Sequence, residues 1–275
     1  MPTASINGVN IWYKETGEGP PIIQFHGGGY CHLNFQYATP LLAKHFRVID
    51  FDLRGCGQSD RPLQRYDFDV WSADAAALMD LLGISRAHVH GTSMGGTIAI
   101  HFAANYRRRV DKLVLNACTA RLDRSGQIHY QNAIDIVEHI GVNNHTLASY
   151  LARQALSREF LDSPGADEAI NRTQEIIAAN VSPEIYKRFY RTLLAADFRP
   201  LLRKISAPTL VIGGEHDMLT PWVAPNGSGM NDLAKNIRDA RKHVIRGSNH
   251  TTLFENPEEH SQVVARFLKA RKRKS

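Results

Sequence analysis

Short apolar runs alternate with amphipathic segments along the first part of the chain. The runs at 21–26 and 47–52 end in glycine-containing loops, which is typical of strands that lead into loops. Between 66 and 82 the apolar residues recur at helical spacing, and Gly83 ends that helix. The same patterns predict strands over 8–13 and 112–117 and a helix over 94–105. Strands that alternate with helices predict a mostly parallel central sheet flanked by helices.

The pattern changes between residues 120 and 200, where helical segments follow one another without an intervening strand. These segments cover 127–140, 145–157, 166–179 and 183–196. Alternation then returns, with an apolar run at 208–214, a strand around 243–245 and a final helix over 257–269. We therefore expect an α/β fold in which residues 1–119 and 201–275 form one core domain. Residues 120–200 are expected to form a helical cap, inserted after the sixth strand.

Length and composition allow a sizeable core. The chain has 275 residues, 43% of them hydrophobic, and no apolar run reaches the ~20 residues that cross a bilayer. The first ten residues contain neither a basic segment nor an apolar stretch, so we expect no secretory signal. Cys31, Cys56 and Cys118 are too few and too scattered for a disulfide framework or a zinc cluster. These features predict a cytoplasmic protein with free thiols and no membrane partner.

The net charge of +6 comes largely from short basic segments, at 107–109 and 269–274. A basic end of this kind is typical of a solvated last helical turn. No aromatic residues interleave with these charges, as stacking on single-stranded nucleic acid would require. We therefore expect a small-molecule substrate and no nucleic-acid partner, while a homo-oligomer stays open.

The segment HVHGTSMGG, at 88–96, places Ser93 between glycines at a predicted strand-to-helix junction. A serine becomes a nucleophile when a base takes its proton and hydrogen-bond donors stabilise the oxyanion. A sharp turn here would expose the Ser93 hydroxyl, and Met94 N–H would point at the developing charge from the start of the next helix. The alternative is an ordinary helix cap, because serine is a preferred cap residue. The segment alone leaves both interpretations open.

Four further motifs accompany this serine in a fixed order along the chain. They are FHGGG at 25–29, DLRGCGQS at 52–59, GEHD at 214–217 and NH at 249–250. Together the five motifs resemble those of the α/β-hydrolase family over nearly the whole chain. The segments DLRGCGQSDRP, HVHGTSMGG and LLAADFRPLLRKI resemble the 3-oxoadipate enol-lactonases and related small esterases within that family. The resemblance implies the α/β-hydrolase fold with a helical cap.

The resemblance also implies a Ser93–His250–Asp217 triad. The chain has 13 histidines, and His250 is the one that follows the last predicted strand, where the family places its base. The residue before it is more commonly glycine in the family and is Asn249 here, a departure expected to affect loop geometry rather than chemistry. Asp217 occupies the family's acid position. Glu215, on the same loop, is the alternative acid, although a bracing role suits it better.

The resemblance assigns the oxyanion hole to two backbone N–H groups, those of Gly28 and Met94. The alternative is that the glycines at 27–29 only form a tight turn. We expect His26 to brace this loop by hydrogen bonding rather than to transfer protons. The DLRGCGQS segment is expected to shape a neighbouring turn, and Cys31 and Cys118 are expected to be small buried residues without a reactive thiolate.

Serine at this position argues against epoxide hydrolase and haloalkane dehalogenase chemistry, because those relatives use aspartate there. Serine with an oxyanion hole fits acyl transfer to water through an acyl-enzyme. We expect hydrolysis of a carboxylic ester or lactone, with no cofactor and no metal. Relatives with the same triad hydrolyse C–C bonds in vinylogous diketones, and this alternative stays open although their usual tryptophan after the histidine is Thr251 here. A hydrolase-like small-molecule receptor is a further alternative.

The predicted cap is expected to cover the strand ends and to determine specificity. Five aromatic residues are candidates to line its pocket, although core packing is expected for most of them: Tyr130, Tyr150, Phe189, Tyr190 and Trp222. The segment 224–229 is longer than this connection usually is in the family. We expect a surface insertion there rather than a mobile flap.

Overall fold

An eight-stranded sheet forms the centre of the fold, with the strand order β1-β2-β4-β3-β5-β6-β7-β8. The computed structural model describes residues 2–270, and the basic segment predicted at the C-terminus lies outside them from residue 271 onward. β1 and β2 run antiparallel to their neighbours, whereas all later pairs are parallel, as expected. The strands are β1 (Thr3–Ile6), β2 (Val9–Thr16), β3 (Pro21–Phe25), β4 (Arg47–Phe51), β5 (Ala87–Thr92), β6 (Val110–Asn116), β7 (Thr209–Gly214) and β8 (Ala240–Ile245).

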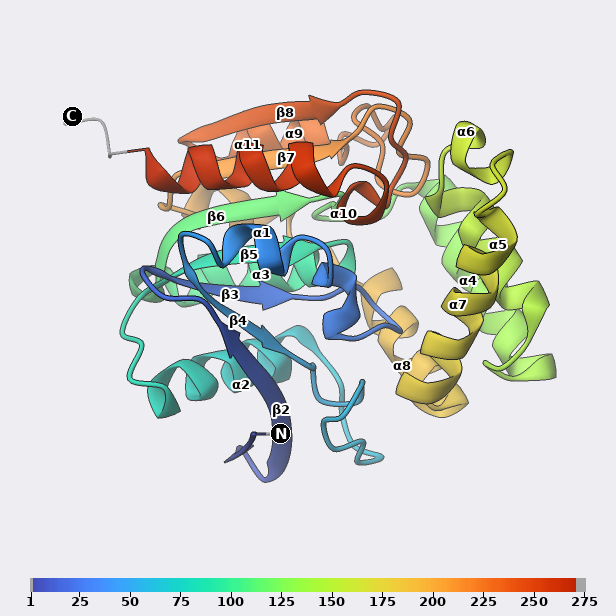
Figure 1. Cartoon of the computed structure of the whole chain (residues 1–275), viewed down its shortest axis with the longest axis horizontal. Helices are drawn as coiled ribbons and strands as arrows, with labels where there is room; N and C mark the ends of the chain where they lie inside the picture. The colour runs from blue at the N-terminus through green and yellow to red at the C-terminus, as the bar shows by residue number, and fades with distance from the viewer. Residues whose placement is uncertain (1, 271–275) are drawn as a thin grey trace.

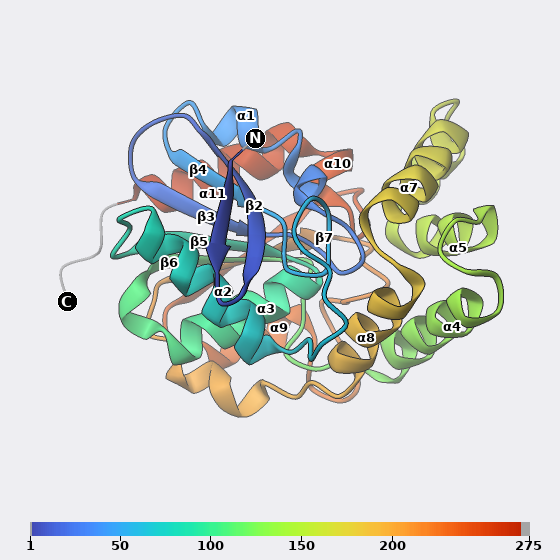
Figure 2. The same ribbon diagram turned by 90° about the horizontal axis from the view of Figure 1, so that it is seen from below.

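Helices cover both faces of this sheet (Figures 1 and 2). Neighbouring residues of a strand point to opposite faces, so Ile22 joins one apolar cluster and Ile23 the other. The Ile22 cluster includes residues of α1 (Thr39–Leu42) and α11 (Pro257–Lys269). The Ile23 cluster includes residues of α2 (Phe68–Leu81), α3 (Met94–Asn105) and α9 (Met230–Asn236). The predicted α/β architecture is thus confirmed.

Five helices lie between β6 and β7 in the sequence and stand beside the carboxyl ends of the strands (Figure 1). They are α4 (Arg124–Ile140), α5 (His145–Ala155), α6 (Arg158–Leu161), α7 (Ala166–Asn180) and α8 (Pro183–Leu194). Four of them are capped by a side-chain oxygen that accepts a hydrogen bond from a backbone N–H of the first turn. The capping residues are Asp123, Asn144, Ser157 and Ser182. These helices form the helical layer that the sequence predicts over residues 120–200.

The remaining elements are short, and several of them were not predicted. β1 pairs with β2 through a tight turn in which Asn7 and Gly8 both have positive φ, at 46° and 76°. β8 begins at Ala240, earlier than its apolar residues suggest, because it is an edge strand with exposed polar positions. α10 (Thr252–Glu255) and three 3₁₀ segments complete the fold: η1 (His32–Phe35), η2 (Arg107–Arg109) and η3 (Arg199–Lys204).

The three cysteines are buried and unpaired. Burial raises the pKa of the Cys31, Cys56 and Cys118 thiols, which keeps them protonated at neutral pH. The expectation of small, unreactive side chains is therefore confirmed. No helix within residues 2–270 combines the length and the apolar character that crossing a bilayer requires.

Candidate active site

Ser93 lies in a sharp turn between β5 and α3, with φ at 53° and ψ at −126°. The turn requires glycine on both sides. A Cβ atom on Gly95 would lie 2.1 Å from Phe25 O, and one on Gly91 would lie 2.4 Å from Gly95 O. The Ser93 side chain makes no capping hydrogen bond to α3, so it is not the helix cap that the sequence left open. The strained backbone instead leaves the Ser93 hydroxyl available to other residues.

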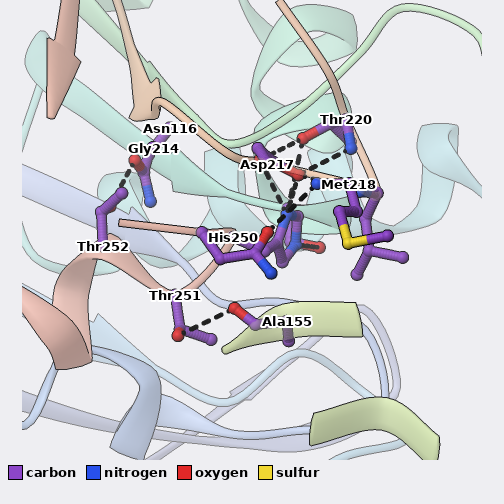
Figure 3. A network of polar contacts seen from close by, with 12 residues as sticks. Asn116, Ala155, Gly214, Asp217, Met218, Thr220, His250, Thr251 and Thr252 are labelled. Atoms are coloured by element: carbon purple, nitrogen blue, oxygen red, sulfur yellow. Dashed lines mark hydrogen bonds and ion pairs between the residues drawn. The ribbon is translucent and has the colours of Figure 1, made fainter. Parts of the chain in front are cut away.

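His250 is placed between Ser93 and Asp217. Its Nε2 lies 3.0 Å from Ser93 Oγ. Its Nδ1 lies 3.0 Å from Asp217 Oδ2 and 3.1 Å from Oδ1, and Figure 3 shows this contact between His250 and Asp217. When Nδ1–H donates to the carboxylate, Nε2 carries the lone pair that can accept the serine proton. The structure thus brings together the three side chains that the resemblance assigns to a triad, from three different loops.

The Asp217 carboxylate is fully buried and fully hydrogen bonded. Besides His250, Oδ1 accepts from the backbone N–H groups of Leu219 at 2.9 Å and Thr220 at 2.8 Å, and Oδ2 accepts from Thr220 Oγ1 at 2.8 Å. These donors offset the cost of burying the charge and fix its orientation toward His250. Glu215 is half-exposed, and its Oε2 accepts from Gly247 N–H at 3.2 Å, so it braces the neighbouring loop.

The loop after β3 brings bare backbone to the site. Asn34 Oδ1 accepts from Gly27 N–H at 2.7 Å, while no hydrogen bond within residues 2–270 uses Gly28 N–H. Tyr190 donates its hydroxyl to Gly28 O at 2.8 Å, which fixes the orientation of that residue. Met94 is the first residue of α3, so its N–H has no partner within the helix. The two N–H groups assigned to the oxyanion hole are therefore both available.

His26 holds this loop against the next one. Its Nε2 accepts from Leu53 N–H at 3.0 Å, which leaves Nδ1–H to donate to Gly27 O at 2.8 Å. Burial lowers the pKa of His26, so the ring stays neutral and keeps both hydrogen bonds. The expected bracing role is confirmed. The adjacent Asp52 carboxylate accepts from His32 and Gln58, and so shapes its own turn, as expected for the DLRGCGQS segment.

A cavity of about 250 Å³ lies between the core and the cap. Gly28, Ser93 and His250 line its floor, and the cap contributes His129 and mostly apolar side chains, among them Tyr130, Leu151, Ala152, Ala155, Leu156, Ile177 and Tyr190. Of the five aromatic candidates, Tyr130 and Tyr190 line this cavity, whereas Phe189 is fully buried in the core. Tyr150 donates its hydroxyl to His129 O, and Trp222 donates its indole N–H to Gly214 O. The expectation of core packing therefore holds for most of the five aromatic residues.

Asn249 contacts more than the loop that carries His250. Its Nδ2 donates to Leu156 O at 2.8 Å and to Gln154 O at 3.1 Å, and both carbonyls belong to the cap. Its Oδ1 accepts from Met218 N–H at 3.1 Å, beside the acid. The departure therefore changes the contacts of the loop with the cap as well as the geometry of the loop itself. One amide side chain connects the loops of His250 and Asp217 to the end of α5.

The two residues after His250 fasten the base loop on opposite sides (Figure 3). Thr251 donates both its N–H and its hydroxyl to Ala155 O in the cap, each at 3.2 Å. Thr252 donates its hydroxyl to Asn116 Oδ1 at 2.9 Å, at the end of β6. The position of His250 therefore depends on the sheet and on the cap together.

The segment 224–229 is only partly the surface insertion that was expected. Its tip at 225–227 is exposed, whereas Ala224, Ser228 and Gly229 are buried. Ser228 O accepts from Thr119 Oγ1 at 2.5 Å, and Asn226 Nδ2 donates to Leu122 O at 3.3 Å. The segment thus packs against the start of the cap.

Comparison with known proteins places these features in context. The sequence model of the α/β hydrolase fold matches residues 20–257. The AB hydrolase superfamily protein YisY of Bacillus subtilis (strain 168) is 30% identical over 94% of this chain and 95% of its own. The 2-hydroxy-6-oxo-6-phenylhexa-2,4-dienoate hydrolase of Comamonas testosteroni is 30% identical over 95% of this chain and 92% of its own. The crystal structure of the enol-lactonase from Burkholderia xenovorans LB400 has a TM-score of 0.87 at 27% identity and covers 98% of this chain and 100% of that one.

Proposed function

The chain belongs to the α/β hydrolase fold family, and we propose that it hydrolyses a carboxylic ester or lactone of a small organic molecule through Ser93, His250 and Asp217. One observation carries the proposal. Ser93 lines the cavity at a strained turn, and its Oγ lies 3.0 Å from His250 Nε2. A serine within hydrogen-bond reach of an oriented base is the arrangement that acyl transfer to water requires.

In the first half of the reaction, Ser93 Oγ attacks the carbonyl carbon while His250 Nε2 takes its proton. Asp217 stabilises the resulting imidazolium through Nδ1–H. The carbonyl oxygen becomes an oxyanion, which the N–H groups of Gly28 and Met94 stabilise. His250 then returns the proton to the leaving oxygen as the carbon–oxygen bond breaks, which leaves an acyl group on Ser93.

In the second half, water takes the place of the departed alcohol. His250 removes a proton from this water as its oxygen attacks the acyl carbon, and the same two N–H groups stabilise the second oxyanion. Collapse of this intermediate breaks the bond to Ser93, and the serine oxygen recovers its proton from His250. Each step uses side chains and backbone of this chain and one water molecule.

A second candidate is C–C bond hydrolysis of a vinylogous diketone. Similarity to the 2-hydroxy-6-oxo-6-phenylhexa-2,4-dienoate hydrolase supports it. Against it, Thr251 lines the cavity where relatives of that type usually carry tryptophan. We therefore rank this reaction after ester and lactone hydrolysis, and a small-molecule receptor without turnover after both.

The test is an activity panel of short-chain aryl esters, an enol-lactone and a vinylogous diketone, combined with fluorophosphonate labelling. We expect turnover of esters or the lactone, labelling of the wild-type protein, and loss of both in Ser93→Ala. Labelling that persists in Ser93→Ala would assign the nucleophile to another residue. Ligand binding without any turnover would favour the receptor. We also place this reaction in the cytoplasm, which the unpaired cysteines support.

A further inference from the structure

His129 is a buried polar side chain without a partner. It lies on α4 and is 5% exposed, and neither of its ring nitrogens has a hydrogen-bond partner within residues 2–270. Buried polar groups in folded proteins are nearly always paired, so an orphaned pair of nitrogens requires an explanation. The position of His129 supplies one, because the residue lines the cavity that also contains Ser93 and His250.

Aromatic neighbours fix the orientation of the His129 ring. Tyr150 stacks on it at 4.8 Å between ring centroids and 9° between planes. Tyr130 meets it edge to face, at 4.9 Å and 79°. Stacking occupies the face of an imidazole and leaves both nitrogens at its edge, where residues 2–270 cover them but offer them no hydrogen-bond partner. The ring is thus held in place before any ligand arrives.

The chemistry of this ring determines what it can bind. Burial, together with the nearby His250, lowers the pKa of His129 to about 4, so the ring is neutral at neutral pH. A neutral imidazole offers one donor and one acceptor, and its tautomer can adjust to its partner. Such a ring matches an uncharged oxygen, either a carbonyl that accepts or a hydroxyl that does both. Most cap side chains that line the same cavity are apolar, and the polar ones besides His129 are Tyr130, Arg172, Thr173 and Tyr190.

We propose that His129 binds a second, uncharged oxygen of the substrate, an oxo or hydroxyl group separate from the carbonyl that Ser93 attacks. This inference rests on the proposed hydrolysis of esters or lactones and specifies their class: short substrates that carry an additional oxo or hydroxyl group. The cavity of about 250 Å³ suits a compact molecule in which the two oxygens are only a few atoms apart. Binding of that oxygen satisfies the side chain that the protein alone leaves unpaired.

The test compares substrates that differ by one oxygen. On the acyl side these are para-nitrophenyl levulinate and para-nitrophenyl pentanoate, and on the alcohol side hydroxyethyl butanoate and ethyl butanoate. We expect the wild-type protein to prefer the oxygenated member of at least one pair, measured as the ratio of kcat/KM. In His129→Phe, which keeps the stacking but removes both nitrogens, that ratio falls about 10-fold, on the scale of one lost hydrogen bond.

Two further variants separate binding from packing. His129→Gln keeps a donor and an acceptor, and we expect it to retain part of the preference. Ser149→Ala removes a hydroxyl of α5 that donates to His145 O at 2.8 Å and does not line the cavity, so the ratio should stay at its wild-type value. The melting temperature of His129→Phe should equal or exceed that of the wild type, because the variant removes a buried group with no partner.

The outcomes distinguish this inference from the proposed function. A wild-type protein that hydrolyses plain and oxygenated members equally well would overturn the role of His129 and leave ester hydrolysis intact. The role would also fail if His129→Phe slowed both members of each pair alike and melted at a lower temperature, because that is the behaviour of a packing residue. No turnover of any of the four esters, combined with no fluorophosphonate labelling, would remove the proposed function itself.

Discussion

Two buried histidines on the sheet side of the His250 loop and one on the cap side differ in how their ring nitrogens are used. On the sheet side, His90 and His260 stack at 5.3 Å, and all of their ring nitrogens have partners. On the cap side, both nitrogens of His129 are unpaired. Burial keeps all three rings neutral by lowering their pKa, so charge does not separate the two groups. The paired rings hold the loop of His250 against the sheet, whereas His129 is the ring to which we assign the second substrate oxygen.

The sheet-side group forms a continuous chain of hydrogen bonds in one direction. Gln24 Nε2 donates to His90 Nδ1 at 3.3 Å, so His90 carries its proton on Nε2 and donates to His260 Nε2 at 3.3 Å. His260 Nδ1–H then donates to Thr252 Oγ1 at 3.2 Å, and this hydroxyl donates to Asn116. Each tautomer is therefore set by the preceding donor. This series of hydrogen bonds passes through Thr252, two residues after His250, and so holds the loop of His250 against the sheet.

The largest predicted effect concerns the contact between Asp217 and His250. Asp217→Asn replaces the acceptor of His250 Nδ1–H with a group that can hold the ring in the wrong tautomer. We expect kcat to fall by about 10⁴-fold, on the scale of other triads. Glu215→Gln, on the same loop, is the matched control and should change kcat less than about 2-fold. Comparable losses in the two variants would move the acid to Glu215.

The next effect tests the sheet-side chain through stability. His260→Leu removes the acceptor of His90 Nε2–H and leaves a buried donor without a partner, so we expect a loss of roughly 2–3 kcal/mol in the free energy of unfolding. Urea denaturation at neutral pH measures this loss. A double variant, His90→Phe with His260→Leu, should lose less than the sum of the two single variants, because both partners are then apolar. Additive losses would show that the two rings do not act as one unit.

The pH dependence of stability tests the cap-side group. The unfolded chain takes up a proton on His129 below pH 6.5, whereas the folded protein resists protonation until about pH 4. The wild-type protein should therefore lose stability as pH falls through this window. Between about pH 8 and about pH 5, His129→Phe should gain roughly 2 kcal/mol relative to the wild type. Thermal unfolding at the two pH values measures the difference, and parallel pH profiles would mean that His129 is not buried as a neutral ring.

The comparison also shows what could be predicted from the sequence. The sheet and its long helices follow from hydrophobic periodicity, whereas Ser93, Asp217 and His250 were assigned through the resemblance of motifs at strand ends to those of the hydrolase family. His129 and His260 lie on amphipathic helices, where a histidine produces the same pattern whether it faces solvent, a cavity or another ring. Only tertiary packing decides between these environments, so their roles could not be predicted. The aromatic residue beside His129 was the one available signal, because Tyr130 was a candidate for the pocket.

The smallest predicted effect concerns Asn249, which connects the loops of His250 and Asp217 to the cap. Asn249→Ala removes the side-chain hydrogen bonds to Gln154 O, Leu156 O and Met218 N–H, and we expect it to lower the free energy of unfolding by about 1 kcal/mol. Hydrogen exchange gives the sharper test. Amides at 154–157, at the end of α5, should exchange faster in this variant, while those of β5 should not change, because the sheet-side chain still holds the base loop from below. Ser149→Ala, on the same helix, is the control and should leave both regions as they are.

Faster exchange in β5 as well would contradict this expectation. It would mean that the cap and the sheet position His250 as one cooperative unit, so that the difference between the sheet-side and cap-side histidines does not extend to stability.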